Sequence, residues 1–360
     1  MIKNLKLKIE NSKNGEVTTP FFALAPMANI TTYPFASQCV KYGADIVWTP
    51  MVHTDTVLNN WDETHKIIDF EHPSCHFDQT ECLPASGGEK TAGKNRSLGK
   101  LETTNMEGVS NYIIQLVGSE PEKFAESIKI IEKHGLRPFS FDINAGCPDK
   151  NIVKSGCGGA LLKTPELIID IIKACQKATK IPISVKTRAG YDNLTDILDL
   201  APYLTKAGVS MITVHPRTVK QGYTGSADWG IVKDVKCLLA NANCLVVGSG
   251  DIKTWQEATE KQKETNCDGV MIGRGALGHP WIFEEIKKQA DIDLPVAKIK
   301  ELAIDLARKA DQIWGNHGIT ESRKHFAWYF RGFEGAKELR IDLMRAETLE
   351  DVVKILKNEN

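Results

Sequence analysis

The sequence predicts an α/β fold, a (β/α)8 barrel followed by a C-terminal all-helical domain. Eight short β-rich runs occur between residues 20 and 290, amphipathic segments separate most of them, and such runs cease after about residue 294. Eight strands that alternate with helices over this length match the size and rhythm of a barrel, so we expect a closed parallel sheet. An open doubly wound sheet is the alternative, but it would need fewer strands and a clear switch point.

The strand candidates are nearly continuous apolar runs, as expected for strands that are buried on both faces. In chain order they read FFALAPM, ADIVWTP, YIIQLVG, PFSFDIN, IPISVKTR, SMITVHP, CLVVGSG and GVMIGRG. The segments between them carry helix signals. SEPEKFAESIKIIEKHG has Ser119 as its predicted cap and Gly135 as its closing residue, and TPELIIDIIKACQKATK opens with Thr164 and Pro165. DWGIVKDVKCLLA and PWIFEEIKKQA follow the sixth and eighth strands.

Two segments interrupt this rhythm. The stretch between Asn60 and Asn111 is polar, rich in Gly and Lys, and longer than a barrel connection needs, so we interpret residues 60–110 as an insertion. After about residue 294 the chain reads as helices, including AKIKELAIDLARKADQIWG, ITESRKHFAWYFRGFEGAKELRIDLMR and TLEDVVKIL. We therefore expect a catalytic barrel domain over residues 1–293, with the insertion, and a helical domain over residues 294–360.

Composition narrows the function classes. The chain has 42% hydrophobic and 25% charged residues, which is typical of a globular enzyme, and no run approaches the roughly 18 apolar residues of a membrane span. The opening MIKN does not read as a signal peptide, and nine cysteines without paired spacing favour a reducing cytoplasm. A net charge of −1 means that any nucleic-acid role needs a local basic surface.

The insertion also contains a possible metal-binding composition. It holds His72, Cys75, His76 and Cys82, but their spacing matches none of the usual zinc ligand pairs. We therefore expect no metal site.

Functional groups of a barrel gather where its strands end, at the C-terminal face. The candidates are Ala25, Pro26 and Met27 after the first strand, Gln115 in the third, Asn144 at the end of the fourth, Lys186 and Arg188 in the fifth, His215 and Arg217 at the end of the sixth, Ser249, Gly250 and Asp251 after the seventh, and Gly273 and Arg274 after the eighth. Side chains alternate along a strand, so Lys186 and Arg188 share a face. Amide, lysine, histidine and arginine groups around one mouth indicate an anionic aromatic ligand.

The last two strand ends indicate a phosphate site. Gly-rich turns after the seventh and eighth strands of barrels commonly bind phosphate through backbone N–H groups, and Arg274 could add a bidentate contact. GRGALG, residues 273–278, spells the dinucleotide-binding pattern, but it follows the last strand and lacks the βαβ context of that motif. A phosphate site here is how FMN commonly sits in barrel oxidoreductases, with Gln115 and Lys186 bonded to the isoalloxazine ring.

One cysteine stands at an unusual place. FDINAGCPDKN, residues 141–151, puts Cys147 on a tight turn just after a strand, whereas buried structural cysteines usually lie inside apolar runs. A lone cysteine on a turn is more often inert than catalytic, so the surrounding motif decides its role. Cys157, ten residues further on, fits a packed small residue better.

These motifs together resemble the tRNA-dihydrouridine synthases over nearly the whole chain. The resemblance lies in APM, NAGCPDKNIVKSGCGGALL, VKTR, HPRTVKQGYTGSADW, GSGDI, GRGALGHPWIF and RKHFAWYFRGFEGAKELR. It implies a flavoenzyme that uses FMN, and NADPH or NADH as reductant, to reduce a uracil base in tRNA. The chain departs from the family pattern at Ser249 and His279, where Asn is expected, and in the length of its insertion.

The resemblance also implies roles for individual residues. Cys147 would be the general acid that protonates C5 of the uracil after hydride transfer from FMN N5 to C6, and a thiol with a reference pKa of ~8.5 is mostly protonated at neutral pH. Asn144 would bond the base or the flavin, and His215 with Arg217 would hold a phosphate or a uracil carbonyl. Arg188 would contact the substrate. The RNA-contacting cations of the tail would be Arg323, Lys324, Arg331, Lys337 and Arg340, with Trp328 and Tyr329 between them.

Two other functions stay open at this point. Another FMN-dependent barrel oxidoreductase, acting on a free pyrimidine such as dihydroorotate, would share the flavin site but would not need a basic helical tail. A non-catalytic RNA-binding protein on the same scaffold would not need Cys147, Lys186 and His215. We expect a monomer, because a tRNA must reach the barrel mouth and the tail together.

Overall fold

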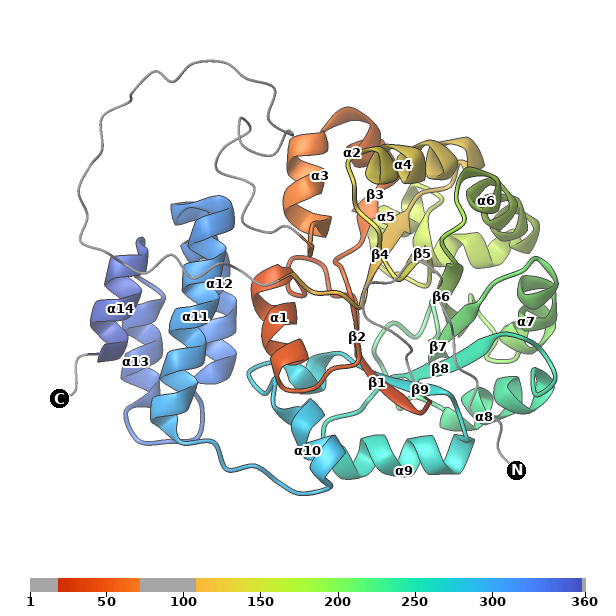
Figure 1. Ribbon diagram of the computed structural model, residues 1–360. Coiled ribbons are helices and arrows are strands. Elements are labelled where there is room, and N and C mark those ends of the chain that lie inside the picture. Colours follow the sequence, from red (N-terminus) through yellow and green to blue (C-terminus); the bar gives the residue numbers. More distant parts are fainter. Residues whose placement is uncertain (1–18, 72–107, 358–360) are drawn as a thin grey trace, which may run out of the picture.

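The computed structural model describes residues 19–71 and 108–357, and its core is a closed parallel barrel (Figure 1). The barrel strands are β1 (Phe21–Leu24), β2 (Ile46–Trp48), β4 (Tyr112–Val117), β5 (Ser140–Ala145), β6 (Ile183–Gly190), β7 (Met211–Thr218), β8 (Leu245–Ser249) and β9 (Gly269–Ile272). Each pairs in parallel with the next, β1 pairs with both β2 and β9, and the β2–β4 pairing closes the ring. The eight predicted strands and the predicted fold class are thus confirmed. The two-residue strand β3 (Val52–His53), which pairs with β4, was not predicted.

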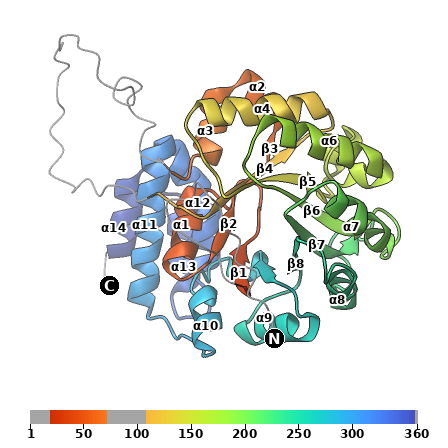
Figure 2. The ribbon, with the colours of Figure 1, turned by 45° about the vertical axis from the view of Figure 1, so that its right-hand side comes forward.

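Helices surround the barrel, as Figure 2 shows. They are α1 (Tyr33–Lys41), α2 (Thr54–Asn59), α3 (Trp61–Ile68), α4 (Pro121–Lys133), α5 (Lys150–Lys154), α6 (Pro165–Ala178), α7 (Asp196–Lys206), α8 (Trp229–Leu238), α9 (Trp255–Thr265) and α10 (Ile282–Lys288), with the short 3-10 turns η1 (Gly158–Lys163) and η2 (Arg274–Ala276). On α4, Phe124, Ile128 and Ile131 are fully buried, and their spacing gives the apolar stripe that packs on the sheet. The predicted cap of α4 was wrong by one residue: the N-cap is Glu120 rather than Ser119, because Pro121 takes the first helical position.

The barrel interior has an apolar part and a polar part. An inner cluster that includes Phe21, Trp48, Met211, Leu245 and Met271 is almost fully buried. Polar side chains replace it toward the strands' C-terminal ends, which surround the barrel mouth. Apolar side chains therefore fill one end of the barrel, and polar side chains line the end where the strands' C-termini lie.

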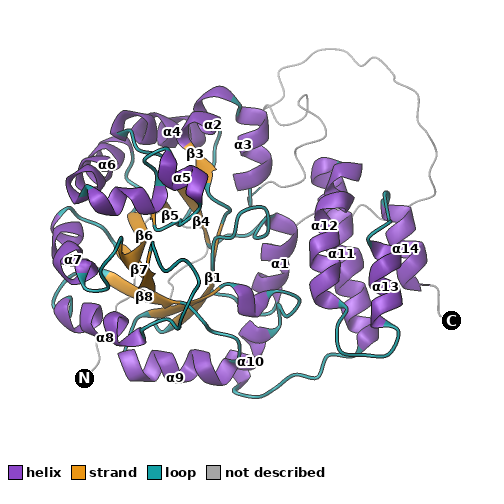
Figure 3. Cartoon of the chain, turned by 180° about the vertical axis from the view of Figure 1, so that it is seen from behind, coloured by secondary structure: helices purple, strands orange, loops and turns teal. Residues whose placement is uncertain are grey.

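The tail forms four helices that pack beside the barrel, visible from behind in Figure 3. They are α11 (Val296–Trp314), α12 (Asn316–Tyr329), α13 (Ala336–Leu343) and α14 (Leu349–Lys357). The sequence suggested one helical run from Ile319 to Arg345, but the chain breaks between α12 and α13. Gly332 and Gly335, both at φ +79°, lie in this break and take a backbone conformation that glycine adopts most readily.

Buried polar bonds join this bundle to the barrel. Gln38 on α1 donates from Nε2 to the Leu302 carbonyl at 2.7 Å, and its Oε1 accepts from the Tyr329 hydroxyl. Gly278 approaches α12 so closely that a Cβ there would lie 2.3 Å from the Trp328 carbonyl oxygen. The bundle and the barrel therefore touch main chain to main chain.

The first part of the predicted insertion, residues 60–110, contains a helix. Residues 61–68 form α3, so regular structure continues beyond Asn60. Residues 72–107, and with them the four candidate zinc ligands, lie outside the described residues. Within the described ranges, no cluster of His, Cys, Asp and Glu could hold a metal ion, and no helix is long and apolar enough to cross a membrane.

Candidate active site

The turn after β5 holds Cys147 at the barrel mouth. The Asn144 side-chain oxygen accepts from the Gly146 N–H at 3.1 Å and from the Cys147 N–H at 2.9 Å, which fixes the turn as an Asx-turn does. The thiol is partly buried, and this burial raises the pKa of Cys147 above its ordinary value. The sulfur therefore carries a proton at neutral pH.

A series of hydrogen bonds between buried side chains inside the barrel supports this turn. Asn144 donates from Nδ2 to Gln115 Oε1 at 2.9 Å, and Gln115 donates from Nε2 to Asp142 Oδ2 at 2.7 Å. Ser184 donates to the other Asp142 oxygen, also at 2.7 Å. An ionised carboxylate only accepts, so Asp142 fixes which end of each amide faces which neighbour. Burial nevertheless raises the pKa of Asp142 to about 6.

Lys186 is a cation at the mouth whose ammonium group is available to a ligand. It pairs in register with Asn144 on one side and Thr213 on the other, so its side chain points into the barrel. Among the described residues no acceptor bonds its ammonium group, and the Thr213 hydroxyl is buried without a partner. Burial lowers the pKa of Lys186 to about 8, although the Asp142 carboxylate opposes this shift. Lys186 is mostly charged at neutral pH and is free to bond a ligand.

His215 is held neutral. Arg217 donates from NH1 to His215 Nε2 at 3.1 Å, and because arginine cannot accept, the imidazole proton must lie on Nδ1. Burial, together with the charges of Lys186, Arg188 and Arg217, lowers the pKa of His215 to about 2. His215 therefore presents an N–H donor at the mouth over the whole neutral range.

Arg217 mostly binds protein groups. It is 2% exposed, and its NH2 donates at 2.6 Å to both the Gly225 carbonyl and Asp251 Oδ2. Its Nε donates to the Thr224 carbonyl. Arg217 thus fixes the loop after β7 and the Asp251 turn.

Arg188 plays a similar structural role on the next strand. Also 2% exposed, it donates to the carbonyls of Gly146, Thr218 and Gly222 at 3.0, 2.9 and 2.6 Å. It therefore ties the Cys147 turn to the loop after β7. The sequence predicted both arginines as substrate contacts, and in the structure most of their donors are already occupied.

The turns after β8 and β9 offer a place for an anion. Among the described residues, the backbone N–H groups of Gly250, Asp251, Arg274 and Gly275 have no protein acceptor. Gly250, at φ +131°, lies so close to His215 that a Cβ there would approach its ring to 3.0 Å. The Arg274 side chain is 60% exposed and only loosely paired with Asp251, at 3.4 Å. Free N–H groups beside an available guanidinium fit a phosphate.

The remaining predicted mouth residues border this site. Ala25 continues the β1 ladder by donating to the Ile272 carbonyl, and the Met27 N–H is capped by the Thr31 hydroxyl. A Cβ at Gly273 would meet the Met27 sulfur at 3.7 Å, so the ends of β1 and β9 lie side by side. Ser249 ends β8 and is 7% exposed.

The predicted tail cations divide into two groups. Arg323 donates twice to the Ala346 carbonyl, Arg340 donates to the Phe330 carbonyl, and Lys324 bonds Glu321 and the Asn29 carbonyl. Arg331 and Lys337 are exposed, and Arg331 bonds only the carbonyl one turn before it on α12. The first three residues support the bundle, and the last two face solvent.

Three residues at the mouth were not selected from the sequence. Asp142 was hidden inside a strand run, and Met51, whose sulfur lies 3.4 Å from Asn144 Nδ2, gave no signal. Tyr223 is 61% exposed, and its ring centroid lies 5.0 Å from the guanidinium carbon of Arg274 and 5.4 Å from that of Arg188. The signal available in the sequence was an aromatic residue between Gly222 and Thr224, within the polar HPRTVKQGYTGSADW segment.

The sequence resembles known proteins over most of its length. A sequence model of the family described as dihydrouridine synthase (Dus) matches residues 88–360. The chain is 30% identical over 348 residues to a probable tRNA-dihydrouridine synthase of Aquifex aeolicus, covering 96% of both chains. It is 31% identical to tRNA-dihydrouridine synthase B of Vibrio cholerae, over 90% of this chain and 91% of that one, and 34% identical to a probable tRNA-dihydrouridine synthase of Rickettsia prowazekii, over 89% of each.

Two solved structures share the fold. Histamine dehydrogenase from Rhizobium sp. 4-9 aligns with a TM-score of 0.51 and 10% identity, over 81% of this chain and 49% of that chain. The 6-hydroxypseudooxynicotine amine oxidase of Pseudomonas geniculata N1 aligns with a TM-score of 0.52 and 9% identity, over 83% and 54%. At such low identity these two likenesses concern the barrel fold alone.

Proposed function

The chain belongs to the dihydrouridine synthase family, and from this premise we propose that it is an FMN-dependent tRNA-dihydrouridine synthase. It would reduce the C5–C6 bond of specific uridines in tRNA, with NADPH or NADH as the source of electrons. The observation that carries the proposal is the protonated Cys147 thiol, which Asn144 holds at the mouth beside Lys186 and His215.

The mouth fits a flavin mononucleotide at two places. The free N–H groups after β8 and β9, with Arg274, suit a single terminal phosphate. Lys186 and the Nδ1–H of His215 are donors that could bond the carbonyl and nitrogen acceptors of an isoalloxazine ring. Gln115 has one N–H left after its bonds to Asp142 and Asn144, so its contribution would be smaller than the sequence suggested. When bound, FMN supplies the hydride that reaches C6 of the uracil.

Cys147 would then donate its proton to C5. The raised pKa keeps the proton on sulfur until carbanion character develops at C5, and a general acid needs this property. After transfer, the positive charges of Arg188 and Lys186 would stabilise the thiolate. Arg188 also holds the Gly146 carbonyl, so the same side chain would position the sulfur and steady its charge.

The RNA must present its uridine to this mouth. A base in folded tRNA has to leave its stack to reach a barrel end, and the exposed Arg331 and Lys337 supply positive charge on the bundle for backbone contacts. We therefore propose the barrel, residues 1–293, as the catalytic domain and residues 294–360 as the tRNA-binding domain of a cytoplasmic monomer. Asn144, positioned by its bonds to the Cys147 turn, would act mainly by orienting that turn.

Nucleoside mass spectrometry tests this proposal. Unmodified tRNA is incubated with the protein, FMN and NADPH, and uridine is examined for a gain of about two mass units, the mass of the two hydrogens added. We expect the gain with wild type and with Cys237→Ala, which removes an exposed cysteine on α8, but not with Cys147→Ala. Flavin-loaded protein that NADPH reduces without any gain on tRNA would contradict the proposal and favour a free pyrimidine substrate.

A further inference from the structure

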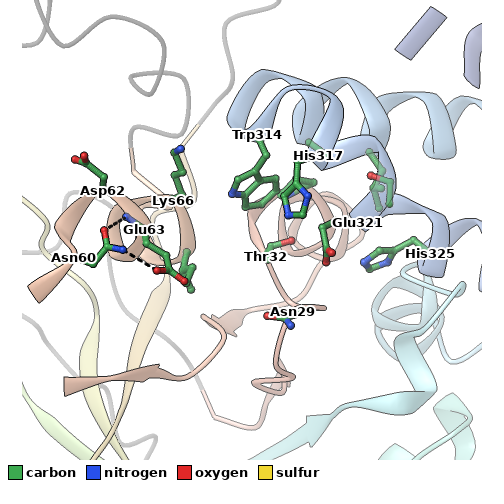
Figure 4. Close-up of a pocket in the computed structure, with 15 residues that line it drawn as sticks. Asn29, Thr32, Asn60, Asp62, Glu63, Lys66, Trp314, His317, Glu321 and His325 are labelled. Atoms are coloured by element: carbon green, nitrogen blue, oxygen red, sulfur yellow. Dashed lines mark hydrogen bonds between the residues drawn. The ribbon is translucent and has the colours of Figure 1, made fainter. Parts of the chain in front are cut away.

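A cavity lies between the barrel and the helical bundle. It has a volume of about 500 Å³, a size that suits a single heterocycle. Figure 4 shows its two walls. One is formed by Asp62, Glu63 and Lys66 on α3 and by the N-cap of that helix, Asn60; the other is formed by Trp314 at the end of α11 and by His317, Glu321 and His325 on α12. None of the predicted mouth residues lines it, so it is a separate site.

The bundle wall of this cavity is aromatic. Trp314 is the last residue of α11, and Gly315 at φ +59° ends the helix there, so that the chain turns and brings His317 to the same wall. Both rings line the cavity, and Figure 4 shows them next to each other. Flat rings of this kind stack on nucleobases with little regard for sequence.

The charge of the cavity selects among RNA groups. Three carboxylates, from Asp62, Glu63 and Glu321, line the cavity together with the ammonium of Lys66. Lys324 on α12 pairs with one oxygen of Glu321 at 2.5 Å, so the carboxylates still exceed the ammonium groups by one. This excess of negative charge disfavours a phosphate and favours a neutral ring that donates hydrogen bonds. Guanine offers two adjacent donors, N1–H and the 2-amino group, which one carboxylate can accept together, whereas uracil offers a single N–H.

His325 gives an independent sign of a ligand. It lines the cavity, is 4% exposed, and its Nδ1 has no hydrogen-bond partner among the described residues. Burial lowers the pKa of His325 to about 3, so the ring is neutral and offers both a donor and an acceptor. Buried polar groups are usually satisfied, so an unpartnered one at a cavity wall calls for a polar occupant.

The cavity also lies next to the barrel mouth along the chain. Asn29 lines it and is two residues after Met27 of the mouth, a separation of at most about 7 Å. Lys324 of α12 fixes this loop by donating to the Asn29 carbonyl at 2.9 Å. The cavity and the mouth are therefore close enough for one RNA to contact both.

We propose that this cavity binds a guanine base of the same tRNA, one that is not reduced, by stacking on Trp314 and by hydrogen bonds to Glu321. The inference rests on the proposed function, since it takes tRNA as the substrate. It adds a site that would select the RNA by base rather than by backbone. The reduced uridine would then be chosen by its separation from this guanine.

Inosine substitution tests the base contact, because inosine lacks only the 2-amino group of guanosine. Unmodified tRNAs that carry inosine at one guanosine position at a time are compared for kcat/KM of dihydrouridine formation. With wild type we expect one position to cost about tenfold, the size of a lost specific base contact. With Glu321→Gln, inosine at that same position should lower kcat/KM only slightly, because the carboxylate that accepts from the 2-amino group has already been replaced. Glu264→Gln, which removes a carboxylate on α9 that is likewise exposed and paired with a lysine, Lys261, should behave as wild type.

RNA affinity gives a readout that does not need the reaction. By fluorescence anisotropy with unmodified tRNA we expect Trp314→Ala to raise Kd about tenfold, the loss of one base stack. Trp255→Ala, which removes another partly buried indole on α9, should leave Kd unchanged. If wild type makes no dihydrouridine but Trp314 still controls tRNA affinity, the proposed function fails and the RNA site stands.

Two results would overturn the guanine site itself. One is the absence of any inosine position whose cost disappears in Glu321→Gln. The other is equal tRNA affinity of Trp314→Ala and Trp255→Ala. Spermidine binding that is lost in Glu321→Gln without any change in tRNA affinity would assign the cavity to a cation instead.

Discussion

The two sides of the barrel mouth, one at the C-terminal end of β5 and the other at those of β8 and β9, use different kinds of groups. At the β5 side, Asn144, Gln115 and Asp142 bond one another and the Cys147 turn through contacts of 2.7 to 3.1 Å, all between buried groups or main chain. At the β8 and β9 side, the available groups are main-chain N–H groups and the exposed Arg274. The position of the thiol thus depends on specific side chains, whereas anion binding depends on backbone that tolerates side-chain changes. Ser249, where the family pattern has Asn, lies at the β8 and β9 side, where we expect side-chain changes to be tolerated.

The largest expected effect is at the β5 side. Asn144→Ala removes the acceptor of two turn N–H groups and the donor to Gln115, so the Cys147 sulfur loses its fixed position. We expect dihydrouridine formation in a single turnover to slow by about 100-fold, as a misplaced catalytic group can cost. Asn59→Ala, on α2, is the control. A rate within a few-fold of wild type would show that the turn holds its shape without Asn144.

Asp142→Asn tests the support one step further from the sulfur. An amide in place of the carboxylate can turn its own N–H groups toward Gln115, which disturbs the bonded chain, and we expect the single-turnover rate to fall by about tenfold, less than for the turn itself. Asp170→Asn, an exposed position on α6, should leave the rate unchanged. Equal rates for both variants would remove Asp142 from the positioning chain.

Asp142 also predicts a pH dependence of stability. Its pKa of about 6 in the folded protein exceeds the value of 3.8 for a free Asp, so the folded state holds an extra proton between about pH 4 and 6. The contribution of Asp142 to the free energy of unfolding should therefore decrease as pH rises through this window and stay constant above it. Denaturant unfolding of wild type and Asp142→Asn at several pH values measures this, and a difference that does not change with pH would contradict it.

Lys186 should make flavin binding pH-dependent. With its pKa near 8, it loses its charge as pH rises above 8, and the affinity of the apoprotein for FMN should fall by up to about tenfold per pH unit there. Quenching of flavin fluorescence between pH 7 and 9 measures this affinity. Lys186→Met should bind FMN more weakly at pH 7 and show no such fall. A variant that keeps the same pH profile would assign the titration to another group.

The smallest effect should come from the β8 and β9 side. Arg274→Ala removes an exposed, loosely paired guanidinium but leaves the backbone N–H groups in place, so we expect FMN affinity to drop only a few-fold. Raising the salt concentration should reduce the difference between wild type and variant. A loss as large as that of Lys186→Met would mean that the side chain, and not the backbone, holds the phosphate.

The sequence predicted the strands and their functional ends because both leave local signals. Each apolar run ends in polar or small residues, and alternation along β6 placed Lys186 and Arg188 on one face. The partners of those residues were not predictable. Arg188 and Arg217 bind carbonyls of loops whose paths depend on the folded barrel, so the sequence could not tell an available guanidinium from an occupied one.

The tail shows the same limit of local signals. Apolar spacing continues from α12 into α13, and it outweighed Gly332 and Gly335, the two residues that mark the break. The sequence predicted Arg323 and Arg340 as RNA contacts but gave no sign of their acceptors, the Ala346 and Phe330 carbonyls, because folding brings these carbonyls within reach. The cavity beside Trp314 left no sequence signal, since its walls come from segments that are far apart in the chain.

The buried Gln38 contacts have a consequence for how the molecule folds. Its amide bonds the bundle at Leu302 and Tyr329, and Gly278 lies directly against Trp328, so removing the tail would leave unpaired polar groups and bare apolar surface on α1. We therefore expect that the two proposed domains, divided near residue 294, do not fold independently. A calorimetric scan of the whole protein should record one cooperative transition. A barrel truncated near residue 294 should be destabilised, so its loss of activity would reflect unfolding and not only the loss of RNA binding.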